Sequence, residues 1–207
     1  MDKIVIIDYG AGNIRSVLNA IKRVSGKDAV VVNSAKDICS ASHMILPGVG
    51  AFDKAMANLN KEPEILEFIK NHINSGKPFL GVCVGMQVLA SLGYENGEVL
   101  GLDFISGEVT KFPEAAGLKI PHMGWNEVSV LQDKVGNFNC KKFDKQDFYF
   151  VHSFYFSCKD QKDIVAKATY NIAFPAIIAK ENVVATQFHP EKSGENGLEF
   201  YKEFLSL

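Results

Sequence analysis

The sequence predicts an α/β fold, with a mostly parallel central sheet flanked by helices and extra β-hairpins in the C-terminal half. The N-terminal half alternates β-branched, strand-like runs with helically spaced apolar residues, which is typical of a parallel sheet covered by helices. After about residue 95 the pattern changes to short strand-like runs separated by Gly, Asn, Asp and Pro. At 207 residues the chain suits one compact domain, so we expect a single domain over residues 1–207.

The N-terminal elements begin with the run from Lys3 to Asp8, whose β-branched residues fit a fully buried parallel strand. After a glycine turn, apolar residues recur at helical spacing from Ile14 to Val24, and Gly26 stands where a C-terminal cap belongs. The next expected elements are a strand over 29–32, a short helix capped by Ser34, a strand over 43–46, helical segments between about 52 and 74 around Pro63, and a strand over 78–82.

The C-terminal elements are expected to be shorter and richer in strands. Strand-like runs occupy residues 109–112, 148–151 and 177–179. Near the end of the chain, Leu198 and Tyr201 begin an apolar pattern with helical spacing, which predicts a helix that closes the domain.

Composition and charge favour a cytoplasmic enzyme over a binding module for nucleic acid or membranes. The chain is 47% hydrophobic and 22% charged, with a formal net charge of −2, so no overall field attracts nucleic acid or an anionic membrane. Its apolar stretches are short, and the N-terminus carries no signal-peptide pattern. We therefore expect a cytoplasmic protein with no nucleic-acid or membrane partner.

The cysteines and histidines do not form a metal pattern. The four cysteines, Cys39, Cys83, Cys140 and Cys158, lie far apart, without a C-x-x-C pair or the spacing of a disulfide framework. Neither His122 nor His152 has a partner at metal-ligand spacing. We expect no metal and no cofactor, and at most one cysteine with special chemistry.

The strongest candidate for that cysteine is Cys83, at the centre of Gly81-Val82-Cys83-Val84-Gly85. This G-x-C-x-G segment follows an expected strand and precedes Met86 to Ala90, where a helix is expected to start, as in a nucleophile elbow. A tight turn needs small flanking residues, and the positive end of a helix favours a thiolate. The N–H of Val84 is placed to stabilise an oxyanion. A buried cysteine beside packing glycines explains the pentapeptide alone equally well.

A second candidate feature is the segment that contains His189-Pro190-Glu191, after a strand-like stretch. In an extended segment, residues two apart point the same way, so Glu191 can approach one ring nitrogen of His189 while the other nitrogen faces a thiol. A cysteine nucleophile needs such a base, and the imidazolium can later protonate the leaving amine. Alone, the pair also fits a surface histidine in a solvated loop.

A third feature is the glycine-rich turn from Leu46 to Phe52, which includes Gly48-Val49-Gly50. Its backbone is expected to supply the second oxyanion donor or to contact a bound carboxylate. No Gly-Lys-Ser/Thr follows, so a nucleotide phosphate loop is disfavoured.

Taken together, these segments resemble the class I (triad) glutamine amidotransferases over nearly the whole chain, and most specifically the glutaminase subunits of imidazole glycerol phosphate synthase. The segments that carry the resemblance are Ile7 to Asn13, Leu46 to Phe52, Gly81 to Gln87, Ile120 to Asn126, Val151 to Tyr155, and Phe188 to Ser193.

The resemblance implies hydrolysis of L-glutamine to L-glutamate and ammonia by a Cys83, His189, Glu191 triad. It also implies roles for other residues. The oxyanion donors would be Val84 and Val49, the substrate-binding residues would be Gly48, Gly50, Gln87, Glu95, Ser153 and Phe154, and the residues at a partner interface would be Asn13, Trp125 and Lys192. The implied partner is a (β/α)8-barrel cyclase subunit, which would form a heterodimer with this chain and receive the ammonia for histidine biosynthesis.

Three alternatives remain open at this stage. The same triad fits a glutaminase subunit that supplies ammonia to another synthase, such as a sugar amidotransferase in surface glycan biosynthesis. The fold also fits a non-catalytic regulatory subunit, against which the intact triad argues. A thiol hydrolase acting on another acyl substrate is the third.

Overall fold

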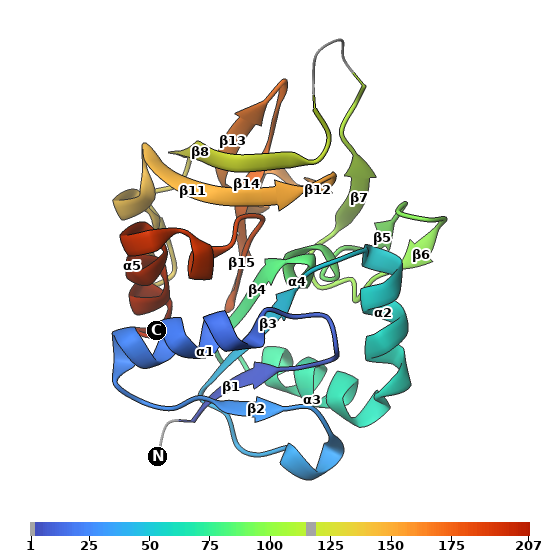
Figure 1. Ribbon diagram of the computed structural model, residues 1–207, viewed down its shortest axis with the longest axis vertical. Helices are drawn as coiled ribbons and strands as arrows, with labels where there is room; N and C mark the ends of the chain where they lie inside the picture. Colours follow the sequence, from blue (N-terminus) through green and yellow to red (C-terminus); the bar gives the residue numbers. More distant parts are fainter. Residues whose placement is uncertain (1–2, 115–118) are drawn as a thin grey trace.

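The computed structural model describes residues 3–114 and 119–207, and its framework is a nine-stranded central sheet (Figure 1). From edge to edge the strands are β11 (Gln146–His152), β8 (His122–Val130), β13 (Ile164–Tyr170), β14 (Ile172–Lys180), β15 (Val183–Thr186), β4 (Phe79–Cys83), β3 (His43–Gly48), β1 (Ile4–Ile7) and β2 (Val30–Val32). A four-stranded sheet contains β12 (Phe154–Cys158), β7 (Gly107–Lys111), β5 (Leu92–Gly93) and β6 (Val99–Leu100), and β10 (Phe138–Asn139) pairs with β9 (Lys134–Val135).

The predicted α/β class is confirmed, but the central sheet is parallel over only half of its width. Strands β2, β1, β3, β4 and β15 pair in parallel, whereas β15, β14, β13, β8 and β11 pair antiparallel. The C-terminal half contains the expected hairpins, formed by β13 with β14 and by β14 with β15, and these strands extend the central sheet. The turns from β13 to β14 and from β14 to β15 are too short for a parallel crossover, so these neighbours must run antiparallel.

The helices cover the parallel half of the sheet. They are α1 (Ile14–Ser25), α2 (Phe52–Lys61), α3 (Pro63–Asn74), α4 (Val84–Gln87) and α5 (Gly194–Phe204), with short 3-10 turns η1 (Ala35–Asp37), η2 (Cys140–Phe143), η3 (Gln161–Asp163) and η4 (Pro190–Lys192). Helix α1 joins β1 to β2, whereas α2 and α3 join β3 to β4 in the opposite direction across the sheet. Right-handed crossovers then place α1 on one face of the sheet and α2 and α3 on the other face. Helix α5 packs against α1 (Figure 1).

Local sequence explains the ends of these helices. Gly26 adopts a left-handed conformation with φ 68° and donates its N–H to the carbonyl of Lys22 at 2.9 Å, which ends α1 as expected. Pro63 opens α3 at the first helical position, where its missing N–H costs nothing. Helix α5 starts at Gly194, earlier than its apolar spacing suggests, because Ser193 closes the preceding 3-10 turn.

One hydrophobic core joins the two halves of the chain. It includes Ile6 and Leu80 from the parallel strands, Phe174 from β14, Phe188 near the C-terminal end of β15, and Phe200 from α5. Within residues 3–114 and 119–207, no helix is long and apolar enough to cross a membrane.

The junction between β4 and α4 forms the predicted elbow. Cys83 has φ 54° and ψ −108°, a conformation that side chains rarely adopt. Gly85 lies so close to β3 that a Cβ atom there would overlap the carbonyl oxygen of Leu46, and a Cβ atom on Gly81 would lie 2.6 Å from the carbonyl oxygen of Gly85. The glycines therefore let the turn close tightly around Cys83.

The helix after the elbow is shorter than expected. Helix α4 ends at Gln87, whereas the sequence predicts that a helix starts over Met86 to Ala90. The carbonyls of residues 88–90 accept hydrogen bonds from the N–H groups of residues 102–104. The backbone after Gln87 therefore pairs with this neighbouring loop and does not continue the helix. A single helical turn contributes little macrodipole, so the thiolate depends mainly on neighbouring side chains.

The elbow geometry predicts the effect of adding one methyl group. Gly85→Ala should lower the free energy of unfolding by about 3 kcal/mol, because the new methyl group must displace the backbone of β3. Gly26→Asn is the matched control, since nothing lies within 4 Å of its Cβ position and Asn tolerates a left-handed conformation, so its cost should be about 1 kcal/mol or less. Urea denaturation measures both, and equal losses would contradict the close approach at Gly85.

Candidate active site

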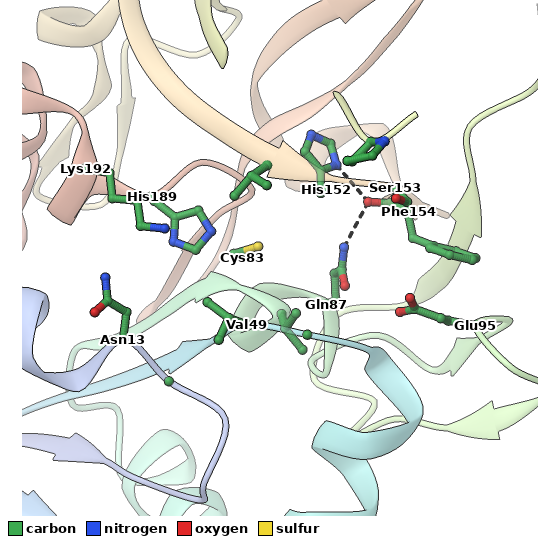
Figure 2. A pocket seen from close by; sticks show the side chains of 15 residues that line it. Asn13, Val49, Cys83, Gln87, Glu95, His152, Ser153, Phe154, His189 and Lys192 are labelled. Atoms are coloured by element: carbon green, nitrogen blue, oxygen red, sulfur yellow. Dashed lines mark hydrogen bonds between the residues drawn. The ribbon is translucent and has the colours of Figure 1, made fainter. Parts of the chain in front are cut away.

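A cavity of about 630 Å³ opens at the C-terminal ends of β3 and β4 (Figure 2). Its wall contains most of the residues that the sequence singles out, namely Asn13, Val49, Gly50, Cys83, Val84, Gln87, Glu95, Ser153, Phe154, His189 and Lys192. The carboxyl ends of parallel strands are the usual place for a binding site in such sheets. Three predicted residues, Gly48, Glu191 and Trp125, do not line the cavity.

Sheet pairing brings the two catalytic segments together. Strand β15 pairs in parallel with β4, with Thr186 opposite Val82, so the chain leaving β15 reaches His189 beside the elbow cysteine. Figure 2 shows the imidazole of His189 next to Cys83. Both residues are buried, with 1% and 3% of their surfaces exposed.

His189 is held firmly on its other side. Its Nδ1 lies 2.8 Å from Oε1 of Glu191, whose side chain is also buried. Its backbone N–H donates to the carbonyl of Tyr149 at 2.9 Å, and its carbonyl accepts from the hydroxyl of Ser193 at 2.7 Å. The remaining ring nitrogen, Nε2, is buried without a nitrogen or oxygen partner among the described residues, so its available neighbour is the sulfur of Cys83.

The negative charges beside His189 favour the protonated form of its imidazole. Burial lowers the pKa of His189, but the negative charges of Cys83 and Glu191 outweigh burial and raise it to about 10. Near neutral pH the imidazole of His189 is therefore protonated, beside the sulfur of Cys83. A cation in this position favours the thiolate form of a cysteine, which is the form that attacks a carbonyl carbon.

The far end of the cavity presents hydrogen-bond acceptors. Gln87 donates its Nε2 to the carbonyl of Phe154 at 3.0 Å, which leaves its Oε1 as the free end of the amide. Glu95 accepts the N–H of Phe52 at 2.8 Å, at the start of α2, and burial raises the pKa of this carboxyl despite that bond. An amide oxygen and a carboxylate together suit an ammonium group.

The glycine-rich turn does not present the donor expected of it. The N–H of Val49 donates to the carbonyl of Ala11 at 2.7 Å, so in this structure it is not aimed at Cys83. The prediction that Val49 supplies an oxyanion donor therefore does not hold in this conformation, because a neighbouring loop already uses the amide. Val84 keeps its place as the first residue of α4, where an N–H has no partner within the helix.

The remaining predicted residues lie around the cavity. Gly48 on β3 is buried and pairs with Cys83 on β4, so its backbone helps to hold the elbow in place. Trp125 is 57% exposed on β8 and packs edge to face with Tyr149 at 6.2 Å between ring centroids. The Nζ of Lys192 lies 5.9 Å from the centroid of the same tyrosine ring, so these side chains connect the cavity to an exposed face.

No group of three or more His, Cys, Asp or Glu side chains within the described part of the chain is arranged to hold a metal ion.

Comparison with known proteins agrees with this geometry. The model of the family "Glutamine amidotransferase class-I" matches residues 5–206. The chain belongs to this family. It is 46% identical over 210 residues to imidazole glycerol phosphate synthase subunit HisH 1 of Campylobacter jejuni (strain RM1221), covering 99% of this chain and 100% of that protein. It is 43% identical over 205 residues to the HisH subunit of Methanothermobacter thermautotrophicus, covering 99% and 98%.

Solved structures share the fold of this amidotransferase at low sequence identity. PurLQS from Thermotoga maritima superimposes with a TM-score of 0.74 at 18% identity, covering 99% of this chain and 98% of that one. The glutaminase domain of Trypanosoma brucei CTPS with bound acivicin gives a TM-score of 0.64 at 13% identity, covering 100% and 94%. At these identities the likeness concerns the fold alone.

Sequence reasoning missed a tyrosine behind the amidotransferase triad. Tyr201 on α5 is fully buried, and burial together with the carboxylate of Glu191 raises its pKa well above the ordinary value. Its hydroxyl and Oε2 of Glu191 are both buried and have no hydrogen-bond partner within the described residues, and the influence of Glu191 on the pKa of Tyr201 indicates that the carboxylate lies near this hydroxyl. The sequence pattern marks Tyr201 only as an apolar position of a helix, which hides this contact.

A second feature that the sequence did not reveal is a buried pair of histidines. Nδ1 of His122 lies 3.1 Å from Nε2 of His152, and Nδ1 of His152 lies 2.8 Å from the carbonyl of Phe154. Burial lowers the pKa of His122 to about 4 and that of His152 to about 3. Both rings are therefore neutral near pH 7, and they support the backbone at the cavity rim.

The contact between Tyr201 and Glu191 predicts a kinetic effect. Tyr201→Phe removes the hydroxyl that faces Oε2 of Glu191, so kcat for glutamine hydrolysis should fall about fivefold while KM changes little. The matched control is Tyr155→Phe, at a half-buried tyrosine on β12. Steady-state glutamate release measures both, and an unchanged kcat for Tyr201→Phe would remove this residue from the mechanism.

The histidine pair predicts a loss of stability in mild acid. Because both pKa values are lowered on folding, the unfolded chain binds more protons between about pH 6.5 and pH 4, and the free energy of unfolding falls as the pH drops through this window. Unfolding at pH 5 should take up about one proton for each histidine. His152→Gln should reduce that uptake by about one proton. The slope of the free energy of unfolding against pH, from urea denaturation at several pH values, measures the uptake. An identical pH dependence in the two proteins would show that His152 is already charged when folded.

Proposed function

We propose that this chain is the glutaminase subunit of imidazole glycerol phosphate synthase, which hydrolyses L-glutamine to L-glutamate and ammonia. The observation that carries the proposal is the buried imidazole of His189, between Cys83 and Glu191 on the wall of a cavity whose other end presents acceptors. The full-length similarity to HisH proteins supports the same assignment. As part of this proposal, the chain is one domain over residues 1–207 and works in the cytoplasm.

The substrate is oriented by the polar groups at the far end of the cavity. Oε1 of Gln87 and the carboxylate of Glu95 accept hydrogen bonds from the α-ammonium group of glutamine. The backbone around Ser153 and Phe154 binds the α-carboxylate, and Gly50 borders the path of the side chain. This orientation places the carboxamide carbon at the sulfur of Cys83.

The first half of the reaction forms a thioester. The thiolate of Cys83 adds to the carboxamide carbon, and the resulting oxyanion is stabilised by the N–H of Val84. The imidazolium of His189 then gives its proton from Nε2 to the leaving nitrogen, the C–N bond breaks, and ammonia departs. Glu191 holds the ring through Nδ1 and stabilises its positive charge.

The second half releases glutamate. His189, now neutral, takes a proton from a water molecule, whose oxygen attacks the thioester carbonyl. The C–S bond breaks, the electron pair returns to the sulfur of Cys83, and the initial thiolate–imidazolium pair is restored. The sum is glutamine and water converted to glutamate and ammonia.

The ammonia passes to a (β/α)8-barrel cyclase subunit bound as a heterodimer, for histidine biosynthesis. Met123 and Trp125 project from β8 with 61% and 57% of their surfaces exposed, which suits a protein interface. Asn13 and Lys192 stand where the cavity meets that side, so ammonia released at Cys83 has a short route to the partner.

The partner also controls the rate in this proposal. Val49 donates its N–H to Ala11, so the oxyanion lacks its second donor until the turn rearranges. Losing one such donor typically costs about a hundredfold to a thousandfold in rate. We therefore expect slow hydrolysis by the isolated chain and faster hydrolysis in complex with a liganded cyclase.

Glutamate release tests this function. The chain with liganded cyclase should release glutamate about a hundredfold faster than the chain alone. Cys83→Ala should abolish release, by about a thousandfold or more, in the same complex. Cys39→Ala, at a half-buried cysteine outside the cavity, is the matched control and should keep the full rate.

Two results would overturn the proposal. Absence of turnover in a well-formed complex would defeat the glutaminase activity. Recovery of a sugar amidotransferase in place of the cyclase as the copurifying partner would defeat the assignment to histidine biosynthesis.

A further inference from the structure

Gln187 is a buried polar residue to which the mechanism above gives no role. It lies two residues before His189, directly after β15, and none of its surface is exposed. Its backbone N–H donates to the carbonyl of Ala176 on β14 at 3.0 Å, which fixes the position of its main chain. Since residues two apart in an extended segment point the same way, its side chain extends toward the same side as the imidazole.

The side chain of Gln187 connects the nucleophile to the substrate-binding amide. Its Nε2 lies 3.7 Å from the sulfur of Cys83, within reach of a hydrogen bond to sulfur. Its Oε1 lies 3.2 Å from Nε2 of Gln87. A primary amide has one donor end and one acceptor end, so Gln187 uses both ends within the site.

The directions of the neighbouring hydrogen bonds leave one consistent assignment. The carbonyl of Phe154 can only accept, so the end of Gln87 that faces it must be the donor nitrogen. That nitrogen also faces Gln187, which must therefore present its oxygen there and its nitrogen to the sulfur. The oxygen of Gln87 is then free for the cavity (Figure 2).

The histidine pair supports the same assignment from the far side. Nδ1 of His152 donates to the carbonyl of Phe154, so its Nε2 accepts from Nδ1 of His122. Nε2 of His122 in turn accepts from Nδ2 of Asn126, at 3.3 Å. Every member of this chain of buried groups has a complementary partner, and such satisfied networks hold their side chains in one orientation.

We propose that Gln187 is a further catalytic residue of the proposed glutaminase: its amide nitrogen stabilises the thiolate of Cys83, and its amide oxygen holds Gln87 with its acceptor toward the substrate. The proposal rests on the function assigned above, but the thiolate contact can be measured without glutamine. A hydrogen bond to the sulfur favours the charged form over the thiol, because the donor is preorganised and excluded from water.

Other groups near the sulfur also influence the ionisation of Cys83. The ionisable groups that face Cys83 are His189, with Glu191 behind it, and Tyr9 from the loop after β1. Among them His189 is the only cation, so it supplies the larger share of thiolate stabilisation. Gln187 adds a neutral donor, whose removal should shift the ionisation of the site without abolishing it.

The experiment measures how the alkylation of Cys83 by iodoacetamide depends on pH, followed by mass spectrometry of the Cys83 peptide in the full chain. Gln187→Met keeps the length of the side chain and removes both polar ends. Its alkylation midpoint should rise by about one pH unit, so that alkylation at pH values below the midpoint slows about tenfold. In the complex with cyclase, the same variant should raise KM for glutamine, because Gln87 loses its orienting partner.

Two comparison variants separate a direct contact from a general loosening of the site. Gln87→Met removes the same bond between Gln87 and Gln187, so it should raise KM but leave the alkylation midpoint nearly unchanged. Asn182→Leu removes two side-chain hydrogen bonds, to the carbonyls of Ile73 and Lys77 at 2.9 and 2.7 Å, at the opposite end of β15. It should lower stability without shifting the midpoint.

The outcomes are distinct. An unchanged midpoint in folded Gln187→Met, or an equal shift in Gln87→Met, would overturn the proposal. If Gln187→Met does not fold by circular dichroism, Gln187→Asn provides the same test, since it keeps an amide but withdraws it from the sulfur. Failure of the unaltered complex to release glutamate would refute the proposed function, while the alkylation midpoints would still decide whether Gln187 contacts the thiolate.

Discussion

The backbone of Cys83 is the constraint on which the rest of the site depends. A non-glycine residue at φ 54° and ψ −108° costs about 1–3 kcal/mol, and the surrounding structure must hold it there. Pairing of β4 with β3 on one side and β15 on the other supplies that support, and Gly85 lets α4 approach the carbonyl of Leu46 closely. The cysteine is thereby presented at the end of a buried strand, at the cavity and beside its base.

The order of strands explains how distant segments become one site. Because β15 lies next to β4, the chain that leaves β15 brings both Gln187 and His189 close to the sulfur of Cys83. His122 at the start of β8 bonds to His152 at the end of β11, and His152 bonds to the carbonyl of Phe154, which in turn orients Gln87. The nucleophile and the substrate-binding amide are therefore connected by hydrogen bonds through Gln187, and the base lies beside the nucleophile.

Much of this arrangement could be predicted from the sequence, since its main signals are local. The glycines around Cys83 predict a tight turn, and the alternation of strands and helices predicts which end of the sheet carries it. The length of α4 could not be predicted, because it depends on hydrogen bonds from the loop around Leu102. The hairpins of the C-terminal half were also predicted, but apolar patterning does not specify which strands become neighbours, so their place in the central sheet could not be predicted.

Contacts between distant elements also explain which site residues sequence reasoning missed or assigned wrongly. Tyr201 reads as an apolar position of a helix, although its hydroxyl faces a carboxylate contributed by a different element. Val49 lies in the expected turn, yet the direction of its N–H depends on a contact with Ala11. For Gln187, a signal was available, since its spacing of two from His189 places both side chains on one side of an extended segment.

The central claim is that glutamine is broken down through a covalent bond to the sulfur of Cys83. Rapid acid quenching of the cyclase complex during turnover, followed by mass spectrometry of its peptides, measures this most directly. The account predicts a glutamyl thioester on the peptide that contains Cys83 and on no other cysteine. Steady turnover with a glutamyl group on a different residue, or with none detectable under conditions in which thioester breakdown is rate-limiting, would contradict it.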